Sequence, residues 1–161
     1  MNDLPDLKVL KDLYRKYVGE IEAEPEWRRL TGTAIYRKHT GDLDGAIEAM
    51  VESIGLTRMV PSLAKETTEN LNYLADLYLL KGSIELAEDA LRESIELSRL
   101  HHPGLLAPNL WILAGIQNRK GEYREALASA EESRRLSQQE GNYHGVKEAE
   151  ELIEKIKTHL K

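Results

Sequence analysis

Cysteine is absent from this chain of 161 residues. The absence excludes disulfides, thiolate metal sites and a thiol nucleophile, and it gives no support to an oxidising compartment. Long uncharged runs are also absent: the apolar centre of the longest, residues 100–118, is shorter than the roughly 20 residues that span a bilayer. The first residues, MNDLPD, are acidic and lack the basic and apolar segments of a signal peptide. We therefore expect a cytoplasmic protein without a membrane segment.

Basic residues are in the minority, because 22 Lys and Arg stand against 28 Asp and Glu for a net charge of -6. Nonspecific binding to nucleic acid needs a concentrated basic face, so we expect no nucleic-acid partner. The composition is 41% apolar and 31% charged, which argues against disorder. The length predicts a single domain over residues 1–161.

Motifs of catalysis and metal binding are missing as well. His101 and His102 are adjacent and would project about 100° apart on a helix, unlike the i, i+4 pair that chelates zinc. His144 and His159 lack a suitably spaced partner, and acidic pairs on helix faces are typical of salt bridges. No phosphate-binding glycine loop or nucleophile elbow occurs. We expect no enzyme, no metal and no cofactor.

Internal repetition is the strongest signal that is present. Three segments align: GDLDGAIEAMVESIGL (41–56), GSIELAEDALRESIEL (82–97) and GEYREALASAEESRRL (121–136). Each begins with glycine, has alanine five residues later and a Glu-Ser pair further on, and ends with leucine. Each unit is predicted to form two helices joined at its glycine, since glycine adopts the left-handed conformation at a helix end without penalty.

The pattern predicts eight helices, near residues 6–22, 26–39, 43–57, 62–80, 84–100, 105–119, 122–139 and 143–160. Pro5, Pro25, Pro61 and Pro103 precede the N-terminal helix and the first helix of each repeat, where a missing N–H costs nothing. Pro108 would kink a helix that already began at Pro103, so we expect an irregular first turn or a later start there. No run alternates with the period of a strand.

The spacing of glycine and small residues resembles the tetratricopeptide repeat (TPR), as carried by LNYLADLYLLKGSIELAEDALRESIEL and LWILAGIQNRKGEYREALASAEESRRL. The repeat length of about 40 residues resembles the long-helix variety of kinesin light chains and of the sensor domain of the maltose-regulon activator. The resemblance implies an all-α fold, a right-handed α-solenoid of antiparallel helix pairs. Its three TPR-like repeats would cover about 26–57, 62–100 and 105–139, with capping helices at 6–22 and 143–160.

Two details of the ends stay open. The segment 6–22 is a cap or the second helix of a truncated repeat, because its apolar stripe suits either. The segment EGNYHGVKEAEELI, at residues 140–153, resembles the start of a further repeat that then stops.

The resemblance also implies that the first helix of each pair lines a concave groove, and helical spacing selects the residues that would face it. Trp111 is the expected anchor, unless it packs against a neighbouring helix. Asn72 and Asn118 can each hold a peptide amide by donating and accepting at once, unless both are merely solvated. Gly115 costs roughly 1 kcal/mol inside a helix, which indicates close approach of a ligand or another helix. The expected partner-binding residues are Arg28, Thr31, Ile35, Lys38, His39, Asn72, Tyr73, Asp76, Leu79, Trp111, Gly115, Asn118 and Arg119.

Charge divides between the two layers of helices. The first helices carry a net positive charge and the second helices a net negative one, which would steer an acidic ligand into the groove. Solvent-exposed helix faces whose net charge has no function would give the same difference in charge between the two layers. Glu88 of a second helix is expected at the surface, where Glu88→Gln would change stability by no more than about 0.5 kcal/mol.

The sequence therefore predicts a non-catalytic scaffold that binds a protein or peptide partner, with an acidic extended segment in the groove. The alternative is a self-associating structural module in which Trp111, Leu79 and Ile35 bury against another copy. A third interpretation is the ligand-sensing portion of a larger regulator.

Overall fold

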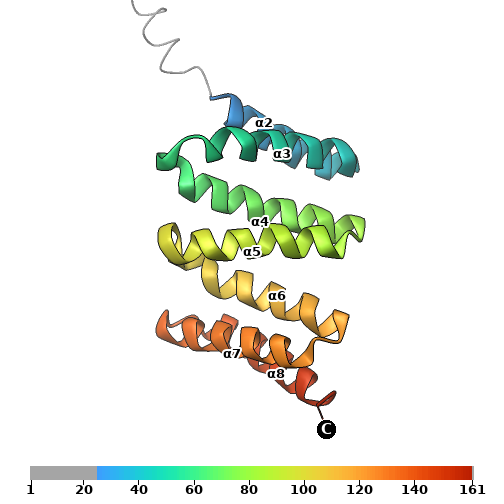
Figure 1. Ribbon diagram of the computed structural model, residues 1–161, viewed down its shortest axis with the longest axis vertical. Helices are drawn as coiled ribbons and strands as arrows, with labels where there is room; N and C mark the ends of the chain where they lie inside the picture. Colours follow the sequence, from blue (N-terminus) through green and yellow to red (C-terminus); the bar gives the residue numbers. More distant parts are fainter. Residues whose placement is uncertain (1–24, 161) are drawn as a thin grey trace, which may run out of the picture.

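The structure, a computed structural model, describes residues 25–160, which form seven α-helices and no strand (Figure 1). Two short 3-10 helices, η1 (Pro61–Leu63) and η2 (Pro103–Leu105), precede α4 and α6. The α-helices are α2 (Glu26–Thr40), α3 (Leu43–Arg58), α4 (Ala64–Lys81), α5 (Ile84–His101), α6 (Leu106–Lys120), α7 (Tyr123–Gln139) and α8 (Tyr143–Lys157). The all-α prediction is confirmed. The helix predicted at 6–22 lies outside the described residues.

Neighbouring helices pack in pairs, and the pairs stack in chain order. The closest packing joins α2 to α3, α4 to α5 and α6 to α7, and α8 packs on α7. Further contacts of α3 with α4 and of α5 with α6 join one pair to the next, which gives the staircase of Figure 1. No pair could bury its apolar face alone, so each one depends on its neighbours. The predicted α-solenoid of helix pairs is confirmed.

The turn inside each of the three pairs is closed by the repeated glycine. Gly41, Gly82 and Gly121 have φ angles of 87°, 80° and 81°. Any residue with a Cβ atom is strained in this left-handed region. The amide of Gly82 donates to the carbonyl of Leu79 and so caps the end of α4, and the other two glycines do the same for α2 and α6.

Proline sets the beginnings of the first helices. Pro61 and Pro103 open the 3-10 turns η1 and η2, and α6 starts only at Leu106. Pro108 is thus the third residue of α6, within the turn whose N–H groups have no intrahelical acceptor. The chain therefore has both an irregular first turn and a later start, and Pro108 breaks no hydrogen bond of the helix.

The serine of each repeated Glu-Ser pair ties a second helix to the first helix of its own pair. These serine hydroxyls are buried and donate to main-chain carbonyls at distances of 2.7, 3.1 and 2.7 Å. The bonds run from Ser53 to Trp27, from Ser94 to Thr68 and from Ser133 to Ala107. The hydrogen-bonding need of a buried hydroxyl explains why serine recurs at this position.

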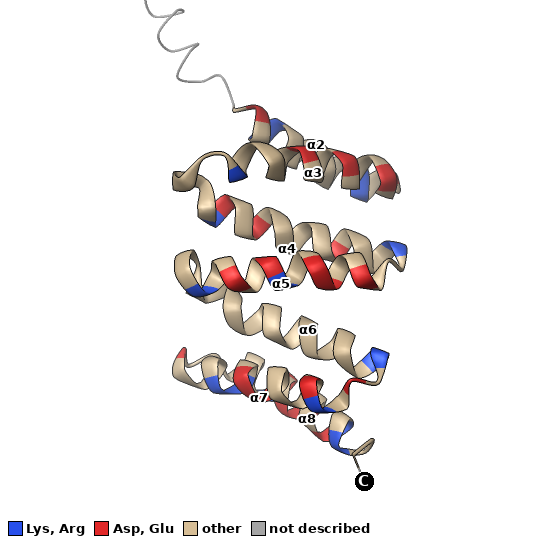
Figure 2. Cartoon of the chain, viewed as in Figure 1, with Lys and Arg blue, Asp and Glu red and all other residues tan. Residues whose placement is uncertain are grey.

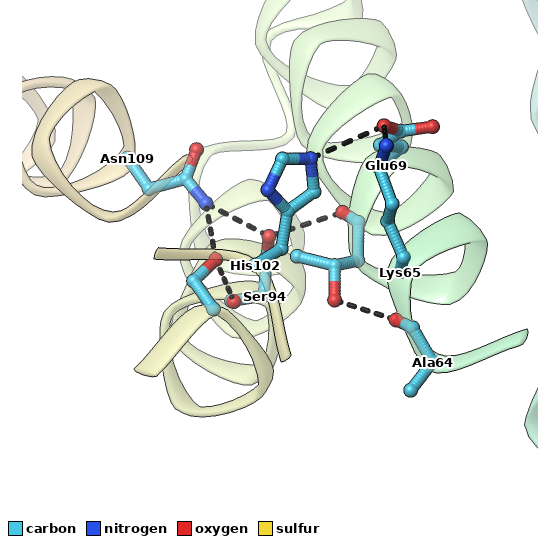
Figure 3. A network of polar contacts seen from close by, with 8 residues as sticks. Ala64, Lys65, Glu69, Ser94, His102 and Asn109 are labelled. Carbon is cyan, nitrogen blue, oxygen red and sulfur yellow. Dashed lines mark hydrogen bonds and ion pairs between the residues drawn. The ribbon is translucent and has the colours of Figure 1, made fainter. Parts of the chain in front are cut away.

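Asparagine extends the same network to the next pair. The side-chain amide of Asn109 on α6 donates to Ser94 Oγ at 2.9 Å (Figure 3), and Asn70 on α4 donates to Ser53 Oγ at 3.1 Å. Figure 3 also shows His102, whose Nε2 lies 3.2 Å from Glu69 Oε1 on α4. These polar contacts fix the stacking of successive pairs and thereby the distances between the first helices.

Candidate functional site

Three adjoining hollows lie on the first-helix side of the array. The α4 hollow, of about 490 Å³, is lined chiefly by α4 residues Glu69, Asn72, Tyr73, Asp76 and Leu79. The basic hollow, of about 290 Å³, lies between α6 and α8 and includes Leu79, Gly115, Ile116, Asn118, Arg119, Leu152 and Lys155. The acidic hollow, of about 260 Å³, includes Pro108, Ser133, Ser137, Glu140, Asn142, Gly145 and Glu148. Trp111 and Ile112 line all three, so the hollows adjoin, and together they are called the groove.

Trp111 stands at the centre of this groove and also holds α8. Its side chain remains 37% exposed, while its indole Nε1 donates to the main-chain carbonyl of Glu148 at 3.3 Å. The sequence left open whether Trp111 faces a groove or packs on a neighbouring helix, and the structure shows both. The indole spans from α6 to α8 and separates the acidic hollow from the basic one.

Two amide side chains that line the groove carry unpaired acceptor atoms. The Oδ1 atoms of Asn72 and Asn118 are buried and accept no hydrogen bond from any described residue. Asn72 lines the α4 hollow and Asn118 the basic hollow. A buried acceptor without a donor costs about 1–3 kcal/mol. Asn109 Oδ1, in the contact between α6 and α5, is unpaired as well, so such an atom does not by itself mark a binding site. A bound chain would reach these oxygens only after a rotation of the side-chain amides.

Gly115 forms an open part of the wall of the basic hollow. A Cβ atom added there would meet no atom within 4 Å, so no described helix approaches Gly115. Close approach of another helix, one of the two explanations that the sequence allowed, is therefore wrong. Room for a ligand remains.

Replacing Gly115 by alanine is expected to raise the free energy of unfolding by about 0.5–1 kcal/mol, because alanine has the higher helix propensity and its methyl group meets no neighbour. Gly55 inside α3 is the matched control, since its Cβ would also meet open space. Urea unfolding of Gly115→Ala and Gly55→Ala should give gains of similar size. A loss of stability for Gly115→Ala alone would contradict the described geometry.

The positive charge of Lys38 is neutralised by an ion pair within the protein. Its ammonium lies 2.5 Å from Asp76 Oδ2 and 4.9 Å from the ring centroid of Tyr73. The hydrogen bond with Asp76 raises the pKa of Lys38 in spite of partial burial. The structure thus brings three of the predicted residues together across α2 and α4, but as an internal ion pair at the edge of the groove.

The remaining predicted residues of α2 line none of the three hollows. Arg28 lies over the ring of Trp27 at 5.1 Å, His39 is exposed, and Ile35 is 38% exposed. Thr31 is half-buried and shares a 2.9 Å hydrogen bond with Ser53, so it belongs to the contact between helices. The groove around Trp111 therefore involves the later first helices rather than α2.

Sequence reasoning missed Ile112 and the contribution of α8. Leu152 and Lys155 line the basic hollow, and Glu148 the acidic one. The sequence assigns α8 only the role of a cap, and its apolar face does bury Ala149, Ile153 and Ile156 as expected of one. The likeness of residues 140–153 to the start of another repeat was the available signal, because a first helix in that position faces the groove.

The prediction that Glu88 lies at the surface is wrong. It is only 7% exposed, and its carboxylate accepts hydrogen bonds from Arg92 at 2.6 Å and from Lys120 of α6 at 2.7 Å. Burial by itself would raise the pKa of Glu88, but the bonds from Lys120 and Arg92 outweigh it and the pKa lies below its ordinary value. Glu122 and Glu88 in turn raise the pKa of Lys120. Glu88 is therefore part of an ion-pair cluster that joins α5 to α6.

We expect Glu88→Gln to lower the free energy of unfolding by about 1–2 kcal/mol at neutral pH, because two charge-assisted hydrogen bonds to partly exposed cations are lost. A lowered folded-state pKa means that the contribution is present above the ordinary pKa of about 4.3 and disappears as pH falls through the lowered one. The difference between the two proteins in urea unfolding should therefore shrink from about pH 7 to about pH 3. Glu96→Gln, at an exposed position of α5 without an ion pair, is the control. Equal small effects of both substitutions would contradict this account.

Other cations of the first helices also form ion pairs. Fewer positive charges are therefore available to a ligand than the sequence predicted. Arg29 contacts Glu26, Arg37 lies 3.7 Å from Asp42, and Lys120 is shared between Glu88 and Glu122. Figure 2 shows acidic residues spread along α5, whereas α6 is uncharged up to its last turn. Positive charge free to meet a ligand in the groove is therefore confined to the basic hollow.

No helix within residues 25–160 combines the length and hydropathy needed to cross a membrane. The same residues contain no group of three or more potential side-chain ligands arranged to hold a metal ion. The cytoplasmic location stays a prediction.

Comparisons with known proteins give the same architecture. MamA superposes with a TM-score of 0.54 at 18% identity, and the match covers 99% of this chain and 95% of that one. The chain has a TPR-like fold. A variant form of a Podosopora anserina protein assigned as a kinesin light chain, with nearly identical TPR-like repeats, matches with a TM-score of 0.50 at 20% identity. That match covers 80% of this chain and 72% of the other. The resemblance to TPR-like repeats that the sequence indicated is thus confirmed at the level of the fold.

Neither a protein-family model nor a curated relative matches the chain.

Proposed function

We propose that this chain is a non-catalytic interaction module that holds an extended peptide segment of a protein partner in the groove formed by α4, α6 and α8. The observation that carries the proposal is Trp111, which is 37% exposed and lines all three hollows. Leu79, Ile112, Ile116 and Leu152 lie beside it in the lining, and Asn72 and Asn118 add polar side chains. A peptide offers what these groups lack, since its main chain supplies N–H donors and its side chains supply apolar surface.

The exposed part of Trp111 favours this function over a solvated surface. Aromatic side chains in partly desolvated pockets supply a large share of the binding free energy at protein interfaces. Here the indole is held in place by its bond to Glu148, so little conformational freedom remains to be lost on binding. Main-chain recognition by two asparagines would tolerate many sequences, and the hollows between them would select side chains.

Selection from a displayed library of random peptides, with the full chain as bait, tests the proposal. We expect enrichment of peptides on the unmodified protein and loss of enrichment on Gly115→Gln, whose longer side chain would fill the basic hollow. Gly55→Gln, with an equally open position on α3, should select the same peptides as the unmodified protein. Peptides that bind all three proteins equally would place binding outside the groove.

Self-association is the competing outcome, because a second copy could cover the same apolar residues. Sedimentation analysis over a range of concentrations distinguishes the two. The proposed function predicts a monomer that binds selected peptides. A dimer that Gly115→Gln dissociates and Gly55→Gln leaves intact would instead assign the groove to another copy of the chain.

A further inference from the structure

The two hollows on either side of Trp111 carry formal charges of opposite sign. Among the described residues, Glu140 and Glu148 line the acidic hollow, and no Lys or Arg lines it. Glu140 forms no ion pair with a described residue, and the one partner of Glu148 is His144 at 3.4 Å, an exposed side chain on the same helix. A positively charged group placed in this hollow would meet two carboxylates.

The basic hollow has the opposite arrangement. Arg119 from α6 and Lys155 from α8 line it together, and no Asp or Glu of the described part of the chain does. Neither cation forms an ion pair within residues 25–160, unlike Lys38 and Lys120 nearby. In Figure 2 the end of α6 is the only charged part of that helix. A carboxylate entering the basic hollow would therefore find two cations.

Helix dipoles do not cancel this division. The positive ends of α6 and α8 face the acidic hollow and their negative ends the basic one, but each end is equivalent to roughly half a unit charge and acts within one turn. Two formal charges in each hollow exceed these partial charges. Trp111 between the hollows keeps the groups of opposite sign apart, so they do not neutralise each other.

We propose that the groove between α6 and α8 selects a bipolar peptide segment, with a basic side chain in the acidic hollow, an apolar side chain against Trp111 and an acidic side chain in the basic hollow. The proposal rests on the proposed function and replaces the uniformly acidic ligand expected from the charge of whole helices. Lys155 follows Glu148 by seven positions on α8, which is about 10 Å at the α-helical rise. An extended chain covers that distance in about three residues, and side-chain reach widens the expected spacing of the two charges to about three to five.

Peptide selection on a charge-reversed variant tests the inference. The unmodified protein should enrich peptides in which Lys or Arg stands about three to five residues from Asp or Glu, with an apolar residue between them. The double variant Arg119→Glu/Lys155→Glu should replace the acidic preference by a basic one, with a change of at least about tenfold in the ratio of acidic to basic residues at that position. Arg124→Glu/Lys147→Glu, two exposed cations outside the groove, gives the same net charge and should leave the preference unchanged.

The outcomes separate this inference from the function on which it rests. Enrichment of peptides with one sign of charge, or the same peptides on both double variants, would overturn the bipolar ligand while leaving a peptide-binding groove. Absence of any enrichment on the unmodified protein would contradict the proposed function and the inference with it. A switch in preference confined to Arg119→Glu/Lys155→Glu supports the inference, and a fold defect cannot imitate it because a misfolded protein selects nothing specific.

Discussion

Gly115→Gln is expected to weaken the binding of a peptide selected on the unmodified protein by about a hundredfold or more. The glutamine side chain would occupy the basic hollow beside Ile116 and Leu152, where a ligand side chain has to sit. An added Cβ meets no atom within 4 Å and glutamine favours helix more than glycine does, so we expect α6 to keep its stability. Isothermal titration calorimetry of the two proteins measures the change directly.

The same substitution at Gly55 is the control for this prediction. Gly55→Gln also adds a helix-favouring side chain in open space, but on α3 and away from the groove, and should leave the affinity within about twofold. Equal losses at both positions would contradict the groove. Trp111→Ala is a weaker test, since Trp111 also bonds to Glu148 and its removal would disturb α8.

Leu91→Ala is expected to lower the free energy of unfolding by about 2–5 kcal/mol, the largest effect on stability that we predict. Leu91 lies in the middle of α5 with 0% exposure, and α5 packs against both α4 and α6. Truncation would leave a cavity that the helices can close only by moving the pairs apart. Urea unfolding followed by circular dichroism measures the loss.

Leu86 on the same helix provides the comparison, because it is 50% exposed. Leu86→Ala should cost no more than about 1 kcal/mol, since half of the side chain already contacts water. A similar cost for both substitutions would mean that α5 is not clamped between its neighbours as described.

The repeated features of the fold could be predicted because each has a local physical cause. The left-handed backbone at a helix end, as at Gly82, strains every residue with a Cβ atom. Glycine therefore recurs at this position. Small residues such as Ala87 are required wherever two helices touch closely, and this one is completely buried. Three copies of such a signal turn weak single preferences into a reliable prediction of helix pairs.

The groove was predicted only in part, because its shape depends on which helices meet in space. Lys38 contributes to the positive charge expected of the groove, yet Asp76 lies 2.5 Å from it across the contact of α2 with α4. Glu88 follows the pattern of a solvated face, yet Lys120 reaches it from the next pair. In both cases the environment of the charge depends on a contact between side chains far apart in the sequence. Such contacts cannot be predicted from a single sequence.

Trp111 and Gly115 could be identified from the sequence, but their surroundings could not. Glycine is unfavourable inside a helix, and this makes Gly115 conspicuous in the sequence alone. Only the structure shows that Leu152 and Lys155 of α8 complete the hollow around it, which turns a capping helix into a wall of the site.

The measurement that tests the central claim most directly is a nuclear magnetic resonance titration of the labelled full chain with a selected peptide. The account predicts that the largest shifts occur at the indole N–H of Trp111, the side-chain amides of Asn72 and Asn118, and the main-chain amides around Gly115. Shifts concentrated on α3, α5 and α7, with the Trp111 indole unmoved, would contradict it and assign binding to the second helices.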